Sequence, residues 1–393
     1  MSSIEEPKCE LILDHGLPPL TQFDEDRKQR VLDLFRERIL AIIEKEYDIG
    51  KVISCCVPAG GGYTRQTVLI MTDQDTRWVI HVYPESFPLE DVEAEVRLLE
   101  YLHSYQLPVN TTQSTRSGLS HFQVSLQDSS VTTSHIHYGV LRSHLIGHHI
   151  TDPSLKTPSV LFEVGRILGR FHAASTSLSL AEYSNLLYPG CSEDDHHLLV
   201  AASASNVASL LRKNLNRIIP AQLSPELLND SPMDLPSIFS QLTQASLDLD
   251  GLDFSGDFET LSCGIIHADC HELNILFSSP SDGSTPFVSG LLDWEDSCWG
   301  LFLIDISLAL IEFSSLDPNL ISSLLSGYQS SFRPLLCAEL EALPRYLLYE
   351  ICQAAAWCAA PSAVHSSECF VHLSNLIHIY HLLPHFSLSP KDF

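Results

Sequence analysis

Apolar and polar residues alternate with a period close to two in the first third of the chain. Lys51–Thr72 and Thr76–Pro84 are rich in β-branched and aromatic residues. Three consecutive glycines interrupt the first segment, which indicates a strand, a turn and a second strand. Two more strand-like stretches lie around residues 119–126 and 136–143. This pattern predicts a small, mostly antiparallel sheet.

Helical periodicity flanks these strands and then dominates the chain. Residues 23–47 and 88–109 place apolar side chains three and four positions apart, which predicts two amphipathic helices. Further helices are predicted at 161–175, as a loop-separated series within 175–260, and as buried helices at 346–360 and 368–383. The expected fold class is therefore α+β, with the sheet first and most helices after it.

A second pair of strands is predicted between the later helices. In Ile265–Phe277, IIHADCHELNILF, a polar loop precedes the strand-like NILF, and VSGLLDW at Val288–Trp294 is the returning strand. Such a hairpin places Asn274, at the start of one strand, near Asp293, at the end of the other. Asp269 projects from the loop before them, and GLFLIDISLAL after them predicts a buried helix.

The chain is strongly acidic. Among 393 residues, 22 Lys and Arg stand against 49 Asp and Glu, a net charge of −27. Such a chain repels phosphate backbones and anionic lipid, so no nucleic-acid or membrane partner is expected. No secretory signal and no apolar run of about 20 residues is found, which indicates a cytoplasmic protein. The oligomeric state stays open.

The eleven cysteines are scattered and form no CxxC pair. This pattern favours reduced, mostly buried thiols over a disulfide framework or a zinc site. The nineteen histidines show no HExxH spacing, so most are interpreted as ordinary surface or core residues.

Asp269, Asn274 and Asp293 form the set that carries chemistry. Mg²⁺ prefers hard oxygen ligands, often one or two protein groups together with phosphates and water. Phosphoryl transfer also needs a carboxylate that positions the attacking hydroxyl and accepts its proton. Two carboxylates and an amide on one hairpin meet both needs. The alternative is a hydrogen-bonded polar turn with capping aspartates.

His267-x-Asp269-xxxx-Asn274, followed by LLDW at Asp293, resembles the catalytic core of the aminoglycoside phosphotransferase and choline kinase-like family of small-molecule kinases. The resemblance implies that Asp269 orients the acceptor hydroxyl and takes its proton. It implies that Asn274 and Asp293 bind Mg²⁺ and that His267 braces the loop. Asp305, on the following helix, would support the loop from behind.

The same resemblance implies a two-lobed, protein-kinase-like fold. Residues 1–140 would form the nucleotide-binding lobe, and residues 141–393 the helical lobe with the catalytic loop and the substrate pocket. ATP or GTP would be the co-substrate. Gly60, Gly61 and Gly62 would cover its phosphates with backbone N–H groups, although a plain hairpin turn fits these glycines equally. Backbone groups from Leu141 to Ser143 would lie near the adenine.

One position departs from the family pattern. The third strand of such kinases carries a lysine, sometimes an arginine, that contacts the phosphates and pairs with a glutamate of the next helix. Glu95 or Glu93 would be that glutamate, unless either lies on a solvated helix face. Here His81 replaces the lysine, and a neutral histidine is a poor substitute for a fixed cation.

Three outcomes of this replacement are open: His81 is protonated, another cation such as Arg65 helps, or turnover is weak. Arg77 faces the same side of the strand but lies near its start. The third outcome keeps an alternative function open, a catalytically impaired pseudokinase that senses a nucleotide or metabolite or binds a partner.

The segment WEDSCWG after the hairpin contains the candidate acceptor site. Glu295 and Asp296, flanked by Trp294 and Trp299, suit a cationic amine through charge pairing and cation–π attraction. The alternative places the tryptophans in the core and Glu295 in a turn. The resemblance implies a small hydroxyl acceptor such as hydroxylysine, choline, ethanolamine, an amino sugar or homoserine. The spacing around HADCHELNIL favours the hydroxylysine kinase-like branch without separating these acceptors.

Overall fold

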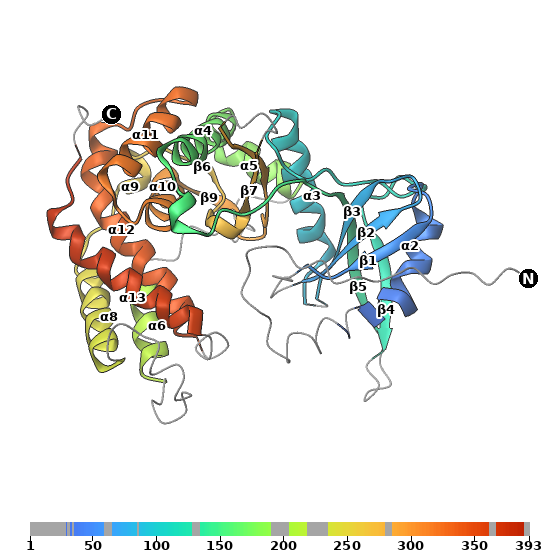
Figure 1. The fold of residues 1–393 in the computed structure, drawn as a ribbon, viewed down its shortest axis with the longest axis horizontal. Coiled ribbons are helices and arrows are strands. Elements are labelled where there is room, and N and C mark those ends of the chain that lie inside the picture. The colour runs from blue at the N-terminus through green and yellow to red at the C-terminus, as the bar shows by residue number, and fades with distance from the viewer. Residues whose placement is uncertain are drawn as a thin grey trace, which may run out of the picture. The chain divides into compact units, whose positions relative to one another are not determined.

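The computed structural model describes residues 29, 32–33, 35–58, 65–84, 86–127, 134–189, 204–217, 235–279, 285–360 and 367–388. The chain divides into two compact units (Figure 1). Unit 1 comprises Met1–His149, Ser184–Ser192 and Ser289–Leu292, and unit 2 comprises Ile150–Tyr183, Glu193–Val288 and Asp293–Phe393. The first boundary between the units follows His149, six residues after the end of the last strand of the large sheet at Ser143.

Unit 1 is built on one five-stranded sheet with the strand order β1-β2-β3-β5-β4. Its strands are β1 (Val52–Cys56), β2 (Gln66–Thr72), β3 (Arg77–Val82), β4 (Phe122–Gln127) and β5 (Ser134–Ser143). All neighbouring strands are antiparallel. His81 of β3 pairs with Thr67 of β2 and with Val140 of β5. The alternation in the sequence predicted these strands because successive side chains point to opposite faces.

Both faces of this sheet pack against helices. Phe35 and Ile43, from the π-helical turn η1 (Phe35–Ile39) and α2 (Leu40–Glu46), belong to one core cluster with Leu141 of β5. Val140, the preceding residue, belongs instead to a cluster with Val96 of α3 (Leu89–Ser104). Adjacent residues of β5 thus serve opposite faces, and α3 covers the face that carries His81.

From residue 150 onward the chain is mainly helical. The helical elements are η2 (Pro153–Leu155), α4 (Pro158–Ser175), α5 (Leu180–Leu187), α6 (Ala204–Leu215), α8 (Leu235–Asp250), α9 (Asp257–Thr260), η5 (Glu272–Asn274), α10 (Phe302–Ala309), η6 (Leu310–Ser314), α11 (Pro318–Ser331), α12 (Cys337–Cys358), α13 (Ser367–Leu382) and η7 (Leu383–His385). Two short sheets pair β6 (Cys263–Ile266) with β9 (Cys298–Leu301) and β7 (Ile275–Ser278) with β8 (Phe287–Leu291).

Glycines allow α4 and α11 to approach each other closely. A Cβ atom at Gly165 would lie 1.8 Å from the carbonyl oxygen of Leu324, and one at Gly327 would lie 2.0 Å from that of Phe162. No larger residue fits between backbones at this separation. The close contact brings His172, near the end of α4, within reach of Tyr328 on α11.

The expected α+β composition and the order of sheet and helices are confirmed. One element was predicted wrongly. GLFLIDISLAL, residues 300–310, was expected to be a buried helix, but Gly300 and Leu301 end the strand β9, which pairs with β6 before α10 begins at Phe302. Continuous apolar runs suit a buried strand as well as a buried helix, so the pattern did not separate the two. Across the described ranges, no helix is long and apolar enough to cross a membrane.

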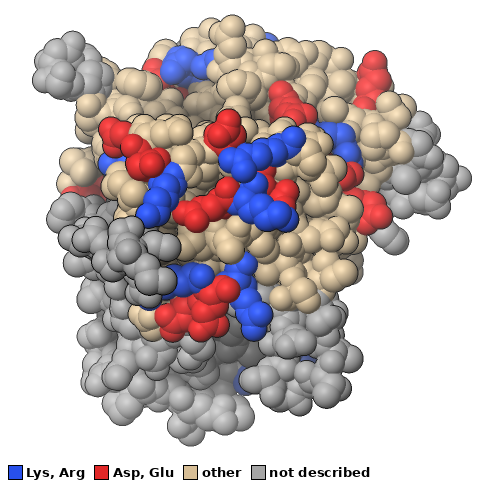
Figure 2. Space-filling view, turned by 90° about the vertical axis from the view of Figure 1, so that its right-hand side faces the viewer, with Lys and Arg blue, Asp and Glu red and all other residues tan. Residues whose placement is uncertain are grey.

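The acidic excess is not gathered into one patch on the face shown in Figure 2, where Lys and Arg side chains lie among Asp and Glu. Exposed pairs in unit 1, such as Lys45 with Glu46 and Arg36 with Asp33, mix the two signs. Eight described cysteines carry free thiols, and six of these are buried, as expected. Cys55 differs from the expectation because it is disulfide-bonded.

Candidate active site

The loop that follows β6 is held through its backbone. Ala268 adopts the left-handed conformation, with φ of 62°, which an alanine takes only where its surroundings hold it. The carboxylate of Asp305, on α10, accepts the backbone N–H of His267 over 2.9 Å and that of Ala268 over 2.8 Å. These two bonds fix the backbone directly before Asp269.

Asp305 is fully buried, and its carboxylate lies against the imidazole of His172. His172 Nε2 lies 3.1 Å from Asp305 Oδ2, and His172 Nδ1 lies 2.9 Å from the hydroxyl of Tyr328. The ring of His172 stacks on Phe302 with 4.2 Å between centroids. Burial alone would raise the pKa of Asp305, but its bond to His172 and the nearby imidazoles outweigh burial and lower that pKa. The carboxylate therefore stays ionised.

Asn274 is bonded directly to Asp269. Its Nδ2 donates to Asp269 Oδ2 over 2.8 Å and to the Asp269 carbonyl oxygen over 2.9 Å. The 3₁₀ turn η5 brings the amide back to the residue five positions earlier. Because the NH₂ group points at Asp269, the amide oxygen of Asn274 is turned away from that carboxylate and can face a cation.

His271 belongs to the same set, although the sequence pattern assigned it no role. Its Nε2 lies 3.2 Å from Asn274 Nδ2 and 3.4 Å from Asp269 Oδ2. Burial lowers the pKa of His271, but the hydrogen bond and charge of Asp269, with a smaller effect of Asp293, outweigh burial and raise that pKa above its usual value. A histidine two residues after an aspartate matches no motif, so only the folded loop shows its position.

Trp294, a candidate acceptor contact, lies in the core of unit 2. It is 2% exposed, and its ring packs against Phe171 and His267, with centroids 5.2 Å and 4.5 Å away. A side chain enclosed in this way has no surface to offer a substrate. The structure therefore favours the core alternative for Trp294 and gives His267 a packing partner.

The other acceptor candidates remain accessible. Glu295 and Trp299 are half-buried, and Asp296 is exposed. The centroid of the Trp299 ring lies 5.6 Å from that of Tyr183, which belongs to α5. Tyr183 is buried, so the accessible part of this group consists of Glu295, Asp296 and Trp299.

The oxygen donors of the hairpin fit a hard divalent cation. In the described part of the chain, no three His, Cys, Asp or Glu side chains gather to form a metal cage. The amide oxygen of Asn274 and the carboxylate of Asp293 instead flank the paired strands β7 and β8. Two protein oxygens of this kind suit Mg²⁺, which keeps its other positions for phosphates and water.

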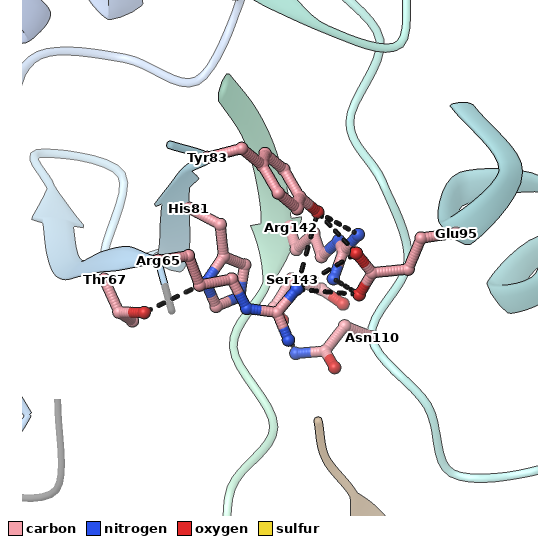
Figure 3. A network of polar contacts seen from close by, with 8 residues as sticks. All are labelled: Arg65, Thr67, His81, Tyr83, Glu95, Asn110, Arg142 and Ser143. Carbon is pink, nitrogen blue, oxygen red and sulfur yellow. Dashed lines mark hydrogen bonds and ion pairs between the residues drawn. The ribbon is translucent and has the colours of Figure 1, made fainter. Parts of the chain in front are cut away.

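A second buried polar cluster lies in unit 1, between the sheet and α3 (Figure 3). The two oxygens of Glu95 lie 2.9 Å and 3.0 Å from Arg65 Nη1, and Oε1 also accepts Arg142 Nη1 over 2.8 Å. The Tyr83 hydroxyl donates to Glu95 over 2.6 Å and accepts Arg142 Nη2 over 3.0 Å. Burial opposes ionisation of Glu95, but Arg142 and Arg65 outweigh it and hold the Glu95 pKa well below its usual value.

His81 lies on the same face of the sheet, with Nδ1 3.1 Å from the hydroxyl of Thr67. Burial, followed by the charges of Arg65 and Arg142, holds the pKa of His81 well below its usual value, against the weaker effect of Glu95. The imidazole is therefore neutral near pH 7. Of the three outcomes left open by the sequence, this geometry disfavours a protonated His81.

Glu95 and Glu93, the two alternatives for the pairing glutamate, point in different directions. Glu93 is half-exposed and pairs with Arg97 one turn later, 3.4 Å away. The solvated helix face therefore describes Glu93, whereas Glu95 points into the buried cluster. Gly60, Gly61 and Gly62 lie outside the described residues.

The backbone groups expected near the adenine are already paired. The carbonyl oxygen of Leu141 accepts the N–H of Gln113, and the N–H of Ser143 donates to the carbonyl oxygen of Thr111, each over 2.8 Å. The other edge of β5 is occupied by β3. The expectation for Leu141 and Ser143 does not fit this pairing, because a base needs backbone groups that the sheet does not use.

The chain matches the model of a family described as "Phosphotransferase enzyme family" over residues 56–343. It is similar to a homoserine kinase of Pseudomonas aeruginosa, with 26% identity over 268 residues, 67% of this chain and 68% of the relative. A homoserine kinase of Paramagnetospirillum magneticum is 24% identical over 305 residues, 76% of this chain and 78% of the relative.

Solved structures resemble the chain in fold at low identity. They include a microcompartment-associated aminopropanol kinase (17% identity, TM-score 0.53, 88% of this chain and 97% of that one). A spectinomycin phosphotransferase bound to ADP and spectinomycin has 12% identity and a TM-score of 0.58, over 88% and 98%. An amicoumacin kinase with AMP-PNP and Ca²⁺ has 13% identity and a TM-score of 0.55, over 94% and 98%. The expected kinase-like α+β fold is thereby confirmed.

Proposed function

This chain belongs to the phosphotransferase enzyme family, and on that premise we propose that it is a kinase of a small metabolite that bears both a hydroxyl and an amine. It transfers the γ-phosphoryl group of ATP or GTP to the hydroxyl. The observation that carries the proposal is the bonded pair of Asp269 and Asn274 on a loop that Asp305 holds by two backbone N–H groups.

Asp269 acts on the acceptor. Among the described residues, Asn274 and His271 both lie against its Oδ2, which leaves Oδ1 to receive the acceptor hydroxyl. Asp269 orients that hydroxyl and accepts its proton while the hydroxyl oxygen bonds to the γ-phosphorus and the bond to the β,γ-bridging oxygen breaks. The nucleoside diphosphate leaves with the electron pair of that bond.

Asn274 and Asp293 hold the divalent cation, for which Mg²⁺ is proposed. The cation, when bound, neutralises phosphate charge. The two bonds from Asn274 Nδ2 to Asp269 keep the amide oriented so that its oxygen remains available, and His271 lies beside both side chains. His267 and Asp305 set the backbone from which Asp269 projects.

Unit 1 contributes the nucleotide-binding residues, with Arg65 and Glu95 among them and His81 on the same face. Because Leu141 and Ser143 are engaged in pairing, recognition of the base is assigned to the irregular segment after β5, residues 144–149. Within this segment, the N–H of His144 donates to the carbonyl oxygen of Arg77, and the carbonyl oxygen of Ile146 accepts the hydroxyl of Ser289 over 2.8 Å.

The proposal that the acceptor bears an amine is based on the negative charge of Glu295 and Asp296. Glu295 and Asp296 follow the metal aspartate directly and remain accessible beside Trp299. The relatives named homoserine kinase and aminopropanol kinase carry names of acceptors with both a hydroxyl and an amine. An ammonium group beside two carboxylates and an aromatic ring is favourable through charge pairing and cation–π attraction.

A nucleotide or metabolite sensor without catalysis is the alternative, and His81 is its support. The two hypotheses differ in one measurement: the sensor is stabilised by Mg·ATP but transfers phosphate to no acceptor. A screen with homoserine, aminopropanol, ethanolamine, choline, hydroxylysine and amino sugars, with ATP and GTP as donors, decides between them.

The variant Asp269→Asn tests the assignment of the catalytic residue. With the best acceptor of the screen, kcat is expected to fall about 10²–10⁴-fold, the usual contribution of a positioned general base. Mg·ATP affinity, measured by calorimetry, is expected to stay within about threefold, because Asp269 is not assigned to the metal.

Asp253→Asn serves as the matched control. Asp253 is an exposed carboxylate of the loop between α8 and α9 that accepts the backbone N–H of Ser255 in the same loop. Its replacement is expected to leave kcat unchanged. Wild-type turnover in Asp269→Asn would contradict the proposal.

A further inference from the structure

Lys156 reaches the loop that carries Asn274 from a distant part of the chain. It lies between η2 and α4, and its ammonium group pairs with the carboxylate of Glu272, the first residue of η5. The same Nζ donates to the backbone carbonyl oxygen of Glu312 over 2.7 Å. The side chains of Lys156 and Glu272 are 13% and 24% exposed, so this pair is less screened by water and salt than an ion pair on the open surface.

The carbonyl oxygen that Lys156 binds lies at the end of a helical run. η6 follows α10 directly and ends at Ser314, and the N–H of Ser315 donates to the carbonyl oxygen of Ile311. The last carbonyl groups of a helix lack an N–H partner within it and carry a partial negative charge. An ammonium group at this end therefore satisfies a carbonyl oxygen and interacts favourably with the helix dipole.

An aromatic ring also fixes the position of this ammonium group. Nζ of Lys156 lies 5.7 Å from the centroid of the Phe313 ring, and Phe313 is 1% exposed. A cation over an aromatic face is attracted by the ring. A carboxylate, a carbonyl oxygen and a ring thus surround one ammonium group, which orders this lysine more than a surface lysine.

The loop between β6 and β7 is attached to the same helical run at two points. At its start, Asp305 of α10 accepts the two backbone N–H groups directly before Asp269. At its end, Lys156 joins Glu272 to the carbonyl oxygen of Glu312 in η6. Asp305 and Glu312 are about two helical turns apart. The catalytic loop is therefore held on both sides of Asp269.

We propose that Lys156 is a positioning residue for the metal ligand Asn274, on which it acts through Glu272. This inference rests on the proposed kinase function. η5 is a single turn that begins with Glu272 and ends with Asn274, so a displacement of the first residue moves the last. Asp269 keeps its own attachment to α10. Loss of Lys156 therefore weakens cation binding more than it weakens proton acceptance by Asp269.

Lys156→Met tests this proposal, because it removes the ammonium group and keeps an unbranched apolar side chain. Mn²⁺ is the probe, since electron paramagnetic resonance measures its free concentration. With saturating ADP, Mn²⁺ affinity is expected to fall about tenfold, as for the loss of an outer partner of a metal ligand, while metal-free ADP affinity stays within about twofold. In the kinase assay, kcat at saturating Mg²⁺ should stay within about threefold of wild type.

Two further variants separate the charge from other effects. Lys213→Met removes an exposed lysine of α6 and is the matched control, which should leave Mn²⁺ affinity and kcat unchanged. Lys156→Arg keeps a cation that can bind a helix-end carbonyl oxygen, and its Mn²⁺ affinity should stay within about threefold of wild type. Unchanged Mn²⁺ affinity in Lys156→Met, or equal losses in Lys156→Met and Lys156→Arg, would overturn the proposal.

Glu272→Gln tests the other member of the pair. Its Mn²⁺ affinity is expected to fall by about the same tenfold. The double variant Lys156→Met/Glu272→Gln should fall no further than either single variant, because both substitutions break one interaction. Losses that multiply in the double variant would give the two side chains independent effects and overturn the proposal.

Should Lys156→Met fail to fold, Glu272→Gln is compared with Glu341→Gln, which changes an exposed glutamate of α12. Only Glu272→Gln should lose Mn²⁺ affinity, and equal affinities in these two variants overturn the proposal.

The same measurements distinguish this inference from the proposed function. A wild-type protein that binds no Mn²⁺ with ADP and transfers no phosphate overturns both. A wild-type protein that binds Mn²⁺ with ADP and transfers phosphate, while Lys156→Met binds Mn²⁺ as tightly, overturns only the role of Lys156.

Discussion

The buried carboxylates Glu95, in unit 1, and Asp305, in unit 2, each lie at the centre of a polar cluster, and their partners differ. In unit 1, Glu95 is shared by two guanidinium groups, which never lose their charge. In unit 2, Asp305 is held by two backbone N–H groups and by the imidazole of His172, with no guanidinium group among these partners.

This difference separates two tasks. Guanidinium groups keep their charge at every physiological pH, so Arg65 and Arg142 tie the sheet to Glu95 of α3 permanently, whereas an ionised carboxylate bonded to backbone N–H groups fixes the shape of a loop. Three substitutions test this contrast.

Removing the carboxylate of unit 1 is expected to have the largest effect. Glu95→Ala removes the carboxylate that two buried guanidinium groups share, which costs about 3–5 kcal/mol of unfolding free energy. Urea denaturation measures this loss. Glu93→Ala, two residues away on the solvated side of α3, is the control and should cost less than about 0.5 kcal/mol. Equal losses in the two variants would mean that the shared carboxylate has no special role.

Replacing the buried carboxylate of unit 2, Asp305, is expected to lower the free energy of unfolding by less. Asp305→Asn keeps one acceptor but turns an NH₂ group toward a backbone N–H, so either His267 or Ala268 loses its partner. An unsatisfied buried donor costs about 1–3 kcal/mol. Because Asp269 then shifts, kcat should fall at least about tenfold with little change in Mg·ATP affinity.

Asp317→Asn is the control for this change. Asp317 caps α11 by accepting two backbone N–H groups, and asparagine caps helices about as well as aspartate. Stability and kcat should both be unchanged. A fall in kcat of the same size in both variants would remove the special role of Asp305.

The smallest effect is expected at Glu350 of α12, and it depends on pH. Glu350 is 1% exposed, and its Oε1 has no hydrogen-bond partner within the described residues. Burial, followed by the charges of Asp305 and Asp269, raises the pKa of Glu350 well above its usual value of 4.5. The folded state therefore holds this proton longer than the unfolded state, and stability falls as pH rises above about 4.5, toward the folded-state pKa.

Glu350→Gln replaces the ionisable carboxyl group with an amide that does not titrate. The variant should be about 1–2 kcal/mol more stable than wild type at pH 7, with a difference that shrinks toward pH 4.5. Urea denaturation at pH 5, 6 and 7 measures it. Glu341→Gln, an exposed position of the same helix, should show no such trend. A difference in free energy of unfolding between Glu350→Gln and wild type that is the same at pH 5, 6 and 7 would contradict the raised pKa of Glu350.

Local pattern was enough to predict the strands, the main helices and the loop around Asp269. Side-chain alternation and helical periodicity extend over a few residues, and the Asp269–Asn274 bond spans only five positions. His271 lies within that loop and was still missed, because its role depends on how η5 turns and not on the spacing of a motif. The strand at 298–301 was missed because an apolar run suits either buried element.

The partners of the buried charges were decided by the tertiary structure. Arg142 meets Glu95 across 47 residues, and His172 meets Asp305 across 133; no local pattern links positions so far apart. The ionisation of a buried group depends on what packs against it, so the sequence could place His81 in the lysine position but could not show that it is neutral. Composition and motif therefore determined the family of phosphotransferases to which the chain belongs, and packing determined which charged side chains meet in each buried cluster.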